Sequence, residues 1–335
     1  MLYVRATRAQ ASFVHTQLIS LGVLDRHARV EHDGDYTFFP VTATIPGYEC
    51  VERESRPHRK PLSLPLALEP LLSPDERAAL IGSYDIVGNI AILEIPDALV
   101  AKEQAIAQAV LSSHTHVRTV LKKAQKHGGE FRTQSFTYLA GEDTREARVI
   151  ESGCTMLVDV EQVYFSVRLS TERLRIASLV QPGEHVLVLF SGAAPYVCIL
   201  ARHSVADKIV GVEKNPIGHK YGLENLRLNK IRHATLYEAD CADLSFLPEH
   251  FDRVIMPLPA SSIQFLPAAL QACKNKAVIH LYYFASEEDL PEIREQIRAI
   301  CVLHGFSSYL QRTVRAGHHA PYVYRWCLDI AIEKK

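Results

Sequence analysis

The sequence predicts an α/β fold built around a mostly parallel sheet of seven strands. Short apolar runs rich in β-branched residues alternate with helical patterns from Val186 to His304, and this alternation is typical of strands joined by helical crossovers. Two further β segments, 307–314 and 322–331, follow without a helix between them. Because strands joined by a short connection run antiparallel, these segments predict an antiparallel strand that closes the sheet.

The first unit of this sheet combines a strand, a tight turn, a helix and a second strand. Val186–Phe190 is an apolar run that suits a strand buried on both faces, and Ser191-Gly192 ends it. Pro195 suits the first position of a helix, where no backbone N–H is needed. Glu213 lies 21 residues beyond Gly192, the distance at which nucleotide-binding units place an acidic side chain on ribose hydroxyls. The turn lacks further glycines, so an ordinary βαβ unit with a solvated Glu213 explains the stretch equally well.

The later strands place further groups at the same edge of the sheet. Asp240 and Pro257 directly follow two of the later strands. Helices are expected at 216–230, 262–273 and 287–304, and strands at 234–238, 251–256 and 277–284. Open α/β sheets bind ligands at the carboxyl ends of their parallel strands, so Gly192, Glu213, Asp240 and Pro257 predict one binding edge.

The residues before this sheet divide into smaller parts. Residues 1–55 mix β runs with a helical stretch at 11–21, which predicts a small α/β module. Residues 56–72 are basic and rich in proline, a composition typical of an extended linker. We therefore expect a middle α+β domain at 73–150 and the main sheet domain at 151–335.

The middle domain contains several start and stop signals. Residues 73–76 read SPDE, a capping box, so a helix is expected from about residue 74. The run 84–96 has a hairpin pattern around Gly88-Asn89. Residues 98–126 have helical spacing, and their basic face is either solvated or in contact with phosphate. That face carries Arg118, Lys122, Lys123 and Lys126.

A second β pattern leads into the main domain. Residues 154–167 predict a hairpin with its turn near 160–162, and Ser170 or Thr171 can cap a helix that ends at Pro182. Glu172 then lies in the first turn, where a carboxylate complements the helix dipole and needs no further purpose. The alternative is a functional role, because this helix leads directly into the first strand of the sheet.

Composition excludes several classes of protein. The chain has 335 residues, of which 47% are hydrophobic and 22% charged, with a formal net charge of −1, as in a soluble globular protein. No apolar run reaches the roughly 20 residues that span a bilayer, and the start lacks a signal-peptide core, so we expect a cytoplasmic protein. The seven cysteines form no Cys-x-x-Cys pair; we expect reduced core thiols and no metal site.

Eight short motifs occur in order along the chain. They are YDIVGNIAIL at 84–93, GGEFR at 128–132, YFSVRLSTER at 164–173, LFSGAAPY at 189–196, VEKNP at 212–216, ENLRLN at 224–229, FDRVIMPLP at 251–259 and HLYYF at 280–284. Together they resemble the archaeal and eukaryotic tRNA (guanine-37 N1)-methyltransferases over about residues 76–332, with YFSVRLSTER the most specific. The resemblance implies a Rossmann-like class I methyltransferase domain after two smaller N-terminal α/β domains, the first a tRNA-recognition module. It also implies a monomer that uses S-adenosyl-L-methionine to methylate guanosine 37 in the anticodon loop of tRNA.

The resemblance also assigns roles to individual residues. N1 of guanine carries a proton at neutral pH, so its methylation needs a base for that proton and a donor for the charge developing on O6. By resemblance Glu172 is the base, Arg132 faces O6 and Arg168 helps to order the site. Of the implied cofactor site, Glu213 would accept ribose hydroxyls, and Asp240 would face the adenine amino group. The whole set is Tyr164, Phe190, Gly192, Ala194, Glu213, Asn215, Asp240 and Pro257.

Three positions depart from the family pattern. Val188 replaces an acidic residue, and this weakens the expected capture of the positively charged methionine amino group. Ala194 replaces a glycine and can do so only where no positive φ is needed, and Pro257 lacks the amide of the usual asparagine. Two alternatives follow: a related wybutosine-pathway transferase acting on the same base, or a tRNA-binding paralogue of weakened activity. A nicotinamide oxidoreductase would need the glycine fingerprint that the turn lacks.

Overall fold

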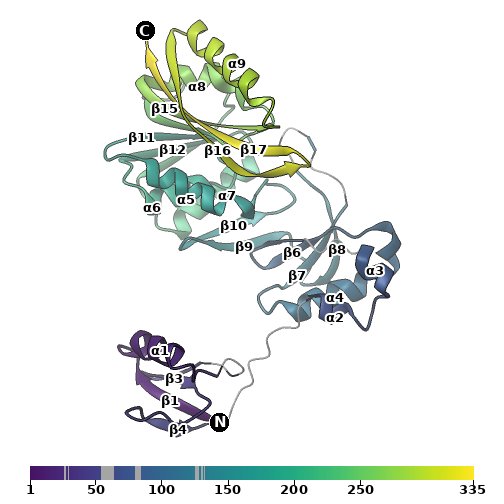
Figure 1. Ribbon diagram of the computed structural model, residues 1–335. Coiled ribbons are helices and arrows are strands. Elements are labelled where there is room, and N and C mark those ends of the chain that lie inside the picture. The colour runs from purple at the N-terminus through teal and green to yellow at the C-terminus, as the bar shows by residue number, and fades with distance from the viewer. Residues whose placement is uncertain are drawn as a thin grey trace. The chain divides into compact units, whose positions relative to one another are not determined.

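The computed structural model divides the chain into two compact units (Figure 1). One unit comprises residues 1–73 with 112–115, and the other comprises residues 74–111 with 116–335. The structure describes residues 1–25, 28, 30–53, 64–79, 84–124, 128–129, 131 and 133–335.

The first unit contains a four-stranded sheet in the order β2-β3-β1-β4. β1 pairs antiparallel with both β3 and β4, and it places Val4 opposite Phe39 on one side and Cys50 on the other. The helix α1 adds Val14 and Leu18 to the small apolar core of this sheet. The elements are β1 (Leu2–Thr7), α1 (Ala11–Ser20), β2 (Glu31–Asp33), β3 (Tyr36–Pro40), β4 (Cys50–Glu52) and α2 (Leu64–Leu68).

The second unit begins with a four-stranded sheet in the order β5-β6-β7-β8. The predicted hairpin is confirmed as β5 and β6, and its turn needs Gly88, which has a φ of +58°. A Cβ there would lie 2.1 Å from the carbonyl oxygen of Arg148. The elements are α3 (Pro74–Ala79), β5 (Asp85–Val87), β6 (Ile90–Leu93), η1 (Asp97–Lys102), α4 (Glu103–Ser113), β7 (Thr119–Lys123) and β8 (Phe136–Gly141).

The helix predicted for 98–126 is wrong beyond the end of α4. Its last part is the strand β7, which pairs parallel with β6 and antiparallel with β8. Hydrogen bonding to two neighbouring strands overrides the local helical spacing here. Of the basic residues on the expected face, Lys122 and Lys123 lie in this strand and form ion pairs with Glu103 and Glu94, whereas Arg118 precedes it and pairs with Glu142. Lys126 lies outside the described residues.

A two-stranded hairpin follows, made of β9 (Glu146–Glu151) and β10 (Cys154–Asp159). The turn of this hairpin lies at Ser152-Gly153 and not near residues 160–162, because β10 pairs antiparallel with β9, the strand that precedes it. The prediction missed this because β9 carries only alternate apolar residues in a largely polar stretch.

The free edge of β10 is covered by two asparagines at the end of the helix α7 (Pro216–Leu228). The Asn225 side chain accepts from the N–H of Leu157 at 2.7 Å and donates to its carbonyl oxygen at 2.9 Å. Asn229 makes the same pair with Thr155, at 2.9 and 2.7 Å. Each primary amide thus replaces the peptide group of a neighbouring strand.

The main sheet has seven strands in the order β13-β12-β11-β14-β15-β17-β16. The strands β11 to β15 are parallel, and β17 runs antiparallel to both β15 and β16, as predicted. The strands are β11 (His185–Leu189), β12 (Lys208–Glu213), β13 (Ala234–Glu238), β14 (Phe251–Met256), β15 (Cys273–Ala285), β16 (Phe306–Ala320) and β17 (Val323–Lys334). The remaining helices are η2 (Val167–Leu169), α5 (Ser170–Leu179), α6 (Pro195–His203), η3 (Ser262–Phe265), α8 (Leu266–Ala272) and α9 (Leu290–Leu303).

Helices cover both faces of this sheet (Figure 1). Side chains of β11 alternate between two cores: Val186 and Val188 pack with α5, α6 and α7, whereas Leu187 and Leu189 pack with α8 and α9. From β11 the chain first builds outward to β12 and β13 and then returns to β14 on the other side. Such a reversal opens a crevice at the carboxyl ends of the two central strands, where ligands of this architecture bind.

All seven cysteines are free, and six of them are buried, as expected of reduced core thiols. No helix in the described part of the chain combines the length and the apolar character needed to cross a membrane.

Candidate functional site

A cavity of about 270 Å³, called the first cavity, lies at the carboxyl ends of β11 to β14. A larger hollow of about 860 Å³ at the start of β15 contains no predicted site residue, and strand starts are not where such sheets bind ligands. The first cavity is lined by seven of the eight residues predicted for the cofactor: Tyr164, Phe190, Gly192, Glu213, Asn215, Asp240 and Pro257.

Glu213 connects the turns that follow β11 and β12. Its Oε2 accepts from the N–H of Gly192 at 2.6 Å, and its Oε1 accepts from the N–H of Asn215 at 2.7 Å. Burial raises the pKa of Glu213, and these backbone hydrogen bonds oppose that effect. A carboxylate has about four lone-pair positions, and the backbone N–H of Lys214 also bonds to this one, so about one position is left for a hydroxyl group in the first cavity.

Gly192 allows the tight turn that brings the backbone N–H to Glu213. Its φ is +55°, a conformation that costs a residue with a Cβ about 1 kcal/mol. The helix α7 approaches the same turn through Gly218, where an added Cβ would lie 3.3 Å from Cγ of Glu213. Small residues on both sides therefore pack the helix N-terminus against the cavity floor.

Asp240 lies at the end of β13 and forms an ion pair with Lys214, with Nζ and Oδ2 2.7 Å apart. The hydrogen bond from Lys214 lowers the pKa of Asp240, and the backbone N–H of Ala242 adds to the effect. Both side chains of the pair are partly exposed. Asp240 is therefore a charged acceptor at the rim of the first cavity.

The opposite wall of the cavity is apolar. The rings of Phe190 and Phe265 meet edge to face with centroids 4.8 Å apart, and Pro257 and Leu258 extend this wall after β14. A wall of this kind suits a flat heterocycle. Asn215 contributes differently, because its Oδ1 caps α7 by accepting from the N–H of Ile217 at 3.0 Å.

Ala194 does not line the first cavity. It is fully buried before α6, with a φ of +62°. The position therefore has the positive φ that favours the family's glycine, and alanine there stores about 1 kcal/mol of backbone strain. Val188 is buried in the sheet core and also lies away from the cavity.

A second cavity of about 200 Å³ shares Val163 and Tyr164 with the first. Arg325 lies in its wall and donates from Nη2 to the Tyr164 hydroxyl at 3.2 Å. The Nε of Arg325 is buried and has no hydrogen-bond partner in the described part of the chain. Arg168 also lines this cavity and donates twice to Asp85, at 2.8 and 3.0 Å, which joins the start of α5 to β5. The second cavity, next to the first, is thus lined by Arg325, by Lys123 and by the ion pair of Arg168 with Asp85.

Glu172 lines neither cavity and is buried in the first turn of α5. Arg175 donates to both of its carboxylate oxygens at 2.7 Å. The Tyr282 hydroxyl donates to Oε1 at 2.6 Å, and Tyr196 donates to Tyr282 at 2.9 Å. These contacts occupy three lone-pair positions of the carboxylate, so one position on Oε2 is left for a proton.

The contacts of Glu172 continue through the sheet as a buried polar network. Arg175 also donates to Oδ2 of Asp329 at 2.7 Å, and His280 donates from Nδ1 to Oδ1 at 2.6 Å. Arg253 donates to Nε2 of His280 at 2.7 Å, so His280 is the neutral tautomer with its proton on Nδ1. We call this set the interior network; its members are Glu172, Arg175, Tyr282, Asp329, His280, Arg253 and Glu184, the last of which pairs with Arg253.

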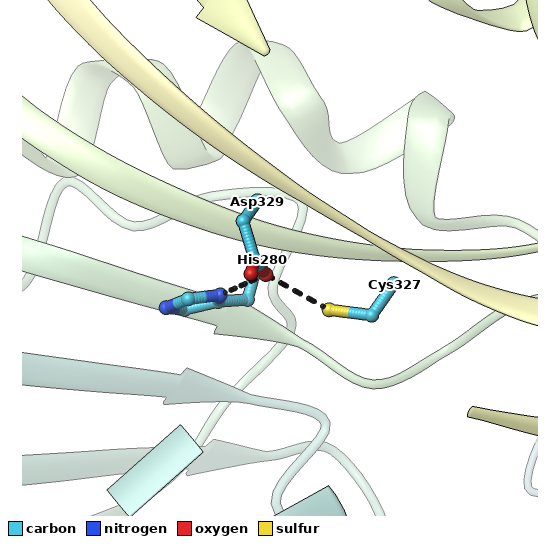
Figure 2. A group of neighbouring side chains, drawn as sticks. All are labelled: His280, Cys327 and Asp329. Atoms are coloured by element: carbon cyan, nitrogen blue, oxygen red, sulfur yellow. Dashed lines mark hydrogen bonds and ion pairs between the residues drawn. The ribbon is translucent and has the colours of Figure 1, made fainter. Parts of the chain in front are cut away.

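Figure 2 shows the part of the interior network around Asp329. His280, Cys327 and Asp329 have donor atoms within 4.8 Å of one another, a spacing that a metal ion could use. Both oxygens of Asp329, however, accept from the guanidinium of Arg175. Burial raises the pKa of the Cys327 thiol well above its ordinary value. A bound guanidinium and a neutral thiol fit a structural network and not a cation site.

The structure also shows what the sequence reasoning missed. Arg132, predicted to face O6 of guanine, lies outside the described residues, and its neighbour Phe131 lines the first cavity. The contact of Arg175 with Glu172 had a sequence signal, since the two are three residues apart on a helix. Asp329 and Arg325 had none, because β17 carries no motif.

Two family models match the chain. The model described as "TRM5/TYW2 methyltransferase domain" matches residues 147–306, and the model described as "TYW2 N-terminal domain" matches residues 66–144.

Individual proteins and structures are similar over most of the chain. The tRNA (guanine(37)-N(1))-methyltransferase Trm5b of Pyrococcus abyssi is 35% identical over 301 residues, covering 88% of this chain and 89% of that protein. The crystal structure of wild-type Trm5b from Pyrococcus abyssi has a TM-score of 0.74 at 32% identity and covers 99% of both chains. The crystal structure of Pyrococcus horikoshii TYW2 in complex with MeSAdo has a TM-score of 0.69 at 25% identity, covering 81% of this chain and 98% of that one.

Proposed function

The chain belongs to the TRM5/TYW2 methyltransferase family, and we propose that it transfers the methyl group of S-adenosyl-L-methionine to N1 of guanosine 37 in tRNA. One observation carries the proposal. The first cavity brings together seven predicted residues from five separate segments of the chain, and through Tyr164 it adjoins a second cavity lined by arginines. This arrangement offers adjacent places for a nucleoside-type donor and for a nucleotide of an RNA chain.

The donor atoms of the first cavity fit an adenosyl group. Glu213 keeps a free lone-pair position for a ribose hydroxyl, and Asp240 offers a charged acceptor at the rim. Phe190 and Phe265 supply an apolar surface for a purine. When bound, S-adenosyl-L-methionine supplies a methyl group already activated on a sulfonium. The protein then has to align N1 with that methyl group and remove the N1 proton.

We propose that Glu172 accepts the N1 proton of guanine, because its carboxylate keeps a free lone-pair position on Oε2. Arg325 and Arg168 give the second cavity a positive lining, which suits the phosphate groups beside the target nucleotide. Arg132 keeps the role implied by the resemblance, facing O6.

The first test compares two transcripts of one tRNA that differ only at position 37. Incubation with labelled donor should methylate the guanosine transcript and leave an adenosine-37 transcript unlabelled. Digestion to nucleosides and mass spectrometry should then identify 1-methylguanosine. Equal labelling of both transcripts would contradict the proposal.

The wybutosine-pathway alternative has its own support. Residues 66–144 match the TYW2 N-terminal domain, and TYW2 from Pyrococcus horikoshii is among the similar structures. That alternative predicts either methylation of a tricyclic base or transfer of the aminocarboxypropyl group. Repeating the assay with tRNA that carries the tricyclic base at position 37 separates the outcomes, because the aminocarboxypropyl group adds more mass than a methyl group and a methylated tricyclic base differs in mass from 1-methylguanosine.

We further propose that the first unit, with its own sheet and core, reads the tRNA outside the anticodon loop. Nuclease protection with the full chain should then extend beyond the anticodon arm. Light scattering at an ionic strength like that of the cytoplasm should show a monomer.

A further inference from the structure

Asp329 shares the guanidinium of Arg175 with Glu172. On one side Arg175 donates to both oxygens of Glu172 at 2.7 Å, and on the other it donates to Oδ2 of Asp329 at 2.7 Å. The exposed fractions of the Glu172 and Asp329 side chains are 7% and 5%. One partly buried cation, 17% exposed, therefore serves two buried carboxylates, and the trio has a net charge of −1.

The other titratable groups in contact with this trio are neutral, and the charged side chains beyond them are paired with each other, Arg253 with Glu184 and Arg173 with Glu151. Burial lowers the pKa of His280, although the hydrogen bond to Asp329 opposes this effect. Burial raises the pKa of Tyr282 and of Cys327 well above their ordinary values, and raises that of Tyr196 above its ordinary value. The groups that face the trio are Tyr196 on α6, His280 and Tyr282 on β15, and Cys327 on β17. The charge balance beside Glu172 is thus set by Arg175 and Asp329.

This balance decides how easily Glu172 takes up a proton. A guanidinium paired with a single carboxylate favours the ionised form of that carboxylate and makes it a weaker base. Protonation would also leave the buried cation unpaired, which is costly. With Asp329 in place, protonation of Glu172 leaves a closed and neutral Arg175–Asp329 ion pair.

We propose that Asp329 is a positioning residue for methyl transfer, which neutralises Arg175 so that Glu172 can accept the N1 proton of guanine. The inference rests on the proposed function. In the step, the N1–H bond breaks and its proton moves to Oε2 of Glu172. The N1 electron pair forms the bond to the methyl carbon, and the carbon–sulfur bond breaks with its electrons left on sulfur. Throughout the step, Asp329 and Arg175 remain a charged pair.

The test is the pH profile of single-turnover methylation of the guanosine-37 transcript by Asp329→Asn. Without the charge of Asp329, Arg175 pairs with Glu172 alone. The acid limb of the profile is the pH range over which the methylation rate falls as the solution becomes more acidic. It should then lie about 1 to 3 pH units lower. The rate above the limb should fall about tenfold, because proton transfer follows the strength of the base.

Glu151→Gln is a matched control that breaks a second buried ion pair of α5. Glu151, at the end of β9, accepts from Arg173 at 2.7 and 2.5 Å, so this pair is also buried and bidentate, and Arg173 directly follows Glu172 in sequence. The control should lose stability like Asp329→Asn but keep the wild-type acid limb. An unmoved limb in Asp329→Asn, or an equal shift in the control, would overturn the inference.

A second variant and a second readout keep the test decisive if Asp329→Asn does not fold. Arg175→Met combined with Asp329→Leu removes the cation and its partner together, which is often tolerated. Glu172 is then buried with Tyr282 alone, and the limb should move to higher pH; no movement, or movement to lower pH, overturns the inference. Infrared difference spectra against Glu172→Gln follow the protonation of Glu172 directly, without donor or tRNA. They should show protonation at lower pH in Asp329→Asn and at higher pH in the double variant. Absence of methylated guanosine with wild-type protein instead contradicts the proposed function.

Discussion

Two buried glutamates of the main domain, Glu213 and Glu172, are held in different ways. Glu213 accepts from backbone N–H groups of two adjacent turns, whereas Glu172 accepts from the side chains of Arg175 and Tyr282. Backbone donors are neutral, so Glu213 keeps its charge facing the first cavity. The Arg175 donor brings a charge of its own, which then needs a partner in Asp329. A ligand-binding carboxylate can thus be held locally, but a proton-accepting one depends on distant strands.

The largest effect is expected where the proton-accepting carboxylate itself is removed. Glu172→Gln should lower the single-turnover methylation rate by about 10² to 10⁴, because the amide cannot accept the N1 proton. A thermal shift with S-adenosyl-L-methionine should remain near that of the wild type, since Glu172 does not line the first cavity. Unchanged turnover would remove Glu172 as the base.

Breaking the interior network should have the largest effect on stability. Arg175→Met leaves Glu172 and Asp329 buried without their cation, so the free energy of unfolding should fall by about 3 to 5 kcal/mol. Arg168→Met removes an exposed ion pair with Asp85 and should cost at most about 1 kcal/mol. Urea denaturation of both variants measures the contrast, and equal losses would refute it.

Removing the backbone-held carboxylate should weaken donor binding. Glu213→Gln loses the charged acceptor for the ribose hydroxyls, so Kd for S-adenosyl-L-methionine should rise about tenfold to a hundredfold, corresponding to about 1.5 to 3 kcal/mol. Glu238→Gln is the matched control, because Glu238 pairs with Glu213 in the sheet but lies outside the first cavity. Calorimetric titration distinguishes the two, and similar affinities for both variants would contradict the assignment.

The interior network should also give stability a pH dependence of known sign. Burial alone would raise the pKa of Asp329, but the hydrogen bonds from His280 and Arg175 outweigh it and hold that pKa below 3.8. The stabilisation is therefore present above about pH 3.8 and is lost as the pH falls through the folded-state value. The difference in unfolding free energy between wild type and Asp329→Asn should shrink from pH 6 to pH 2. A constant difference would mean that Asp329 carries no such linkage.

The smallest effect is expected at the turn beside Glu213. Ala194→Gly relieves the positive φ but loses a buried methyl group and adds freedom to the unfolded chain. These terms nearly cancel, so the unfolding free energy should stay within about 1 kcal/mol of wild type. Ala193→Gly, equally buried but without a positive φ, should lose about 1 kcal/mol more. Thermal denaturation can rank them, and the reverse order would argue against strain at Ala194.

The same contrast explains how far the sequence could predict the molecule. The strand ends that carry Gly192, Glu213 and Asp240 follow from local spacing, and the structure places all three in the first cavity. Local spacing failed at β7, where pairing with two strands decides the backbone conformation. It could not find Asp329, which meets Arg175 across 154 residues of chain. Contacts of that kind depend on strand register, which a single sequence does not reveal.

Asn225 of α7 and Asn229, its C-cap, cover a strand edge that could otherwise pair with another chain. An uncovered strand edge offers unpaired N–H and C=O groups as a template for another chain, a common start of aggregation. Four residues of helix rise about 6 Å and two residues of strand about 6.6 Å, so Asn225 and Asn229 can match alternate residues of β10. Their amides occupy the edge at Thr155 and Leu157 without adding another strand. The backbone groups of Thr155 and Leu157 are therefore not available to pair with a further strand.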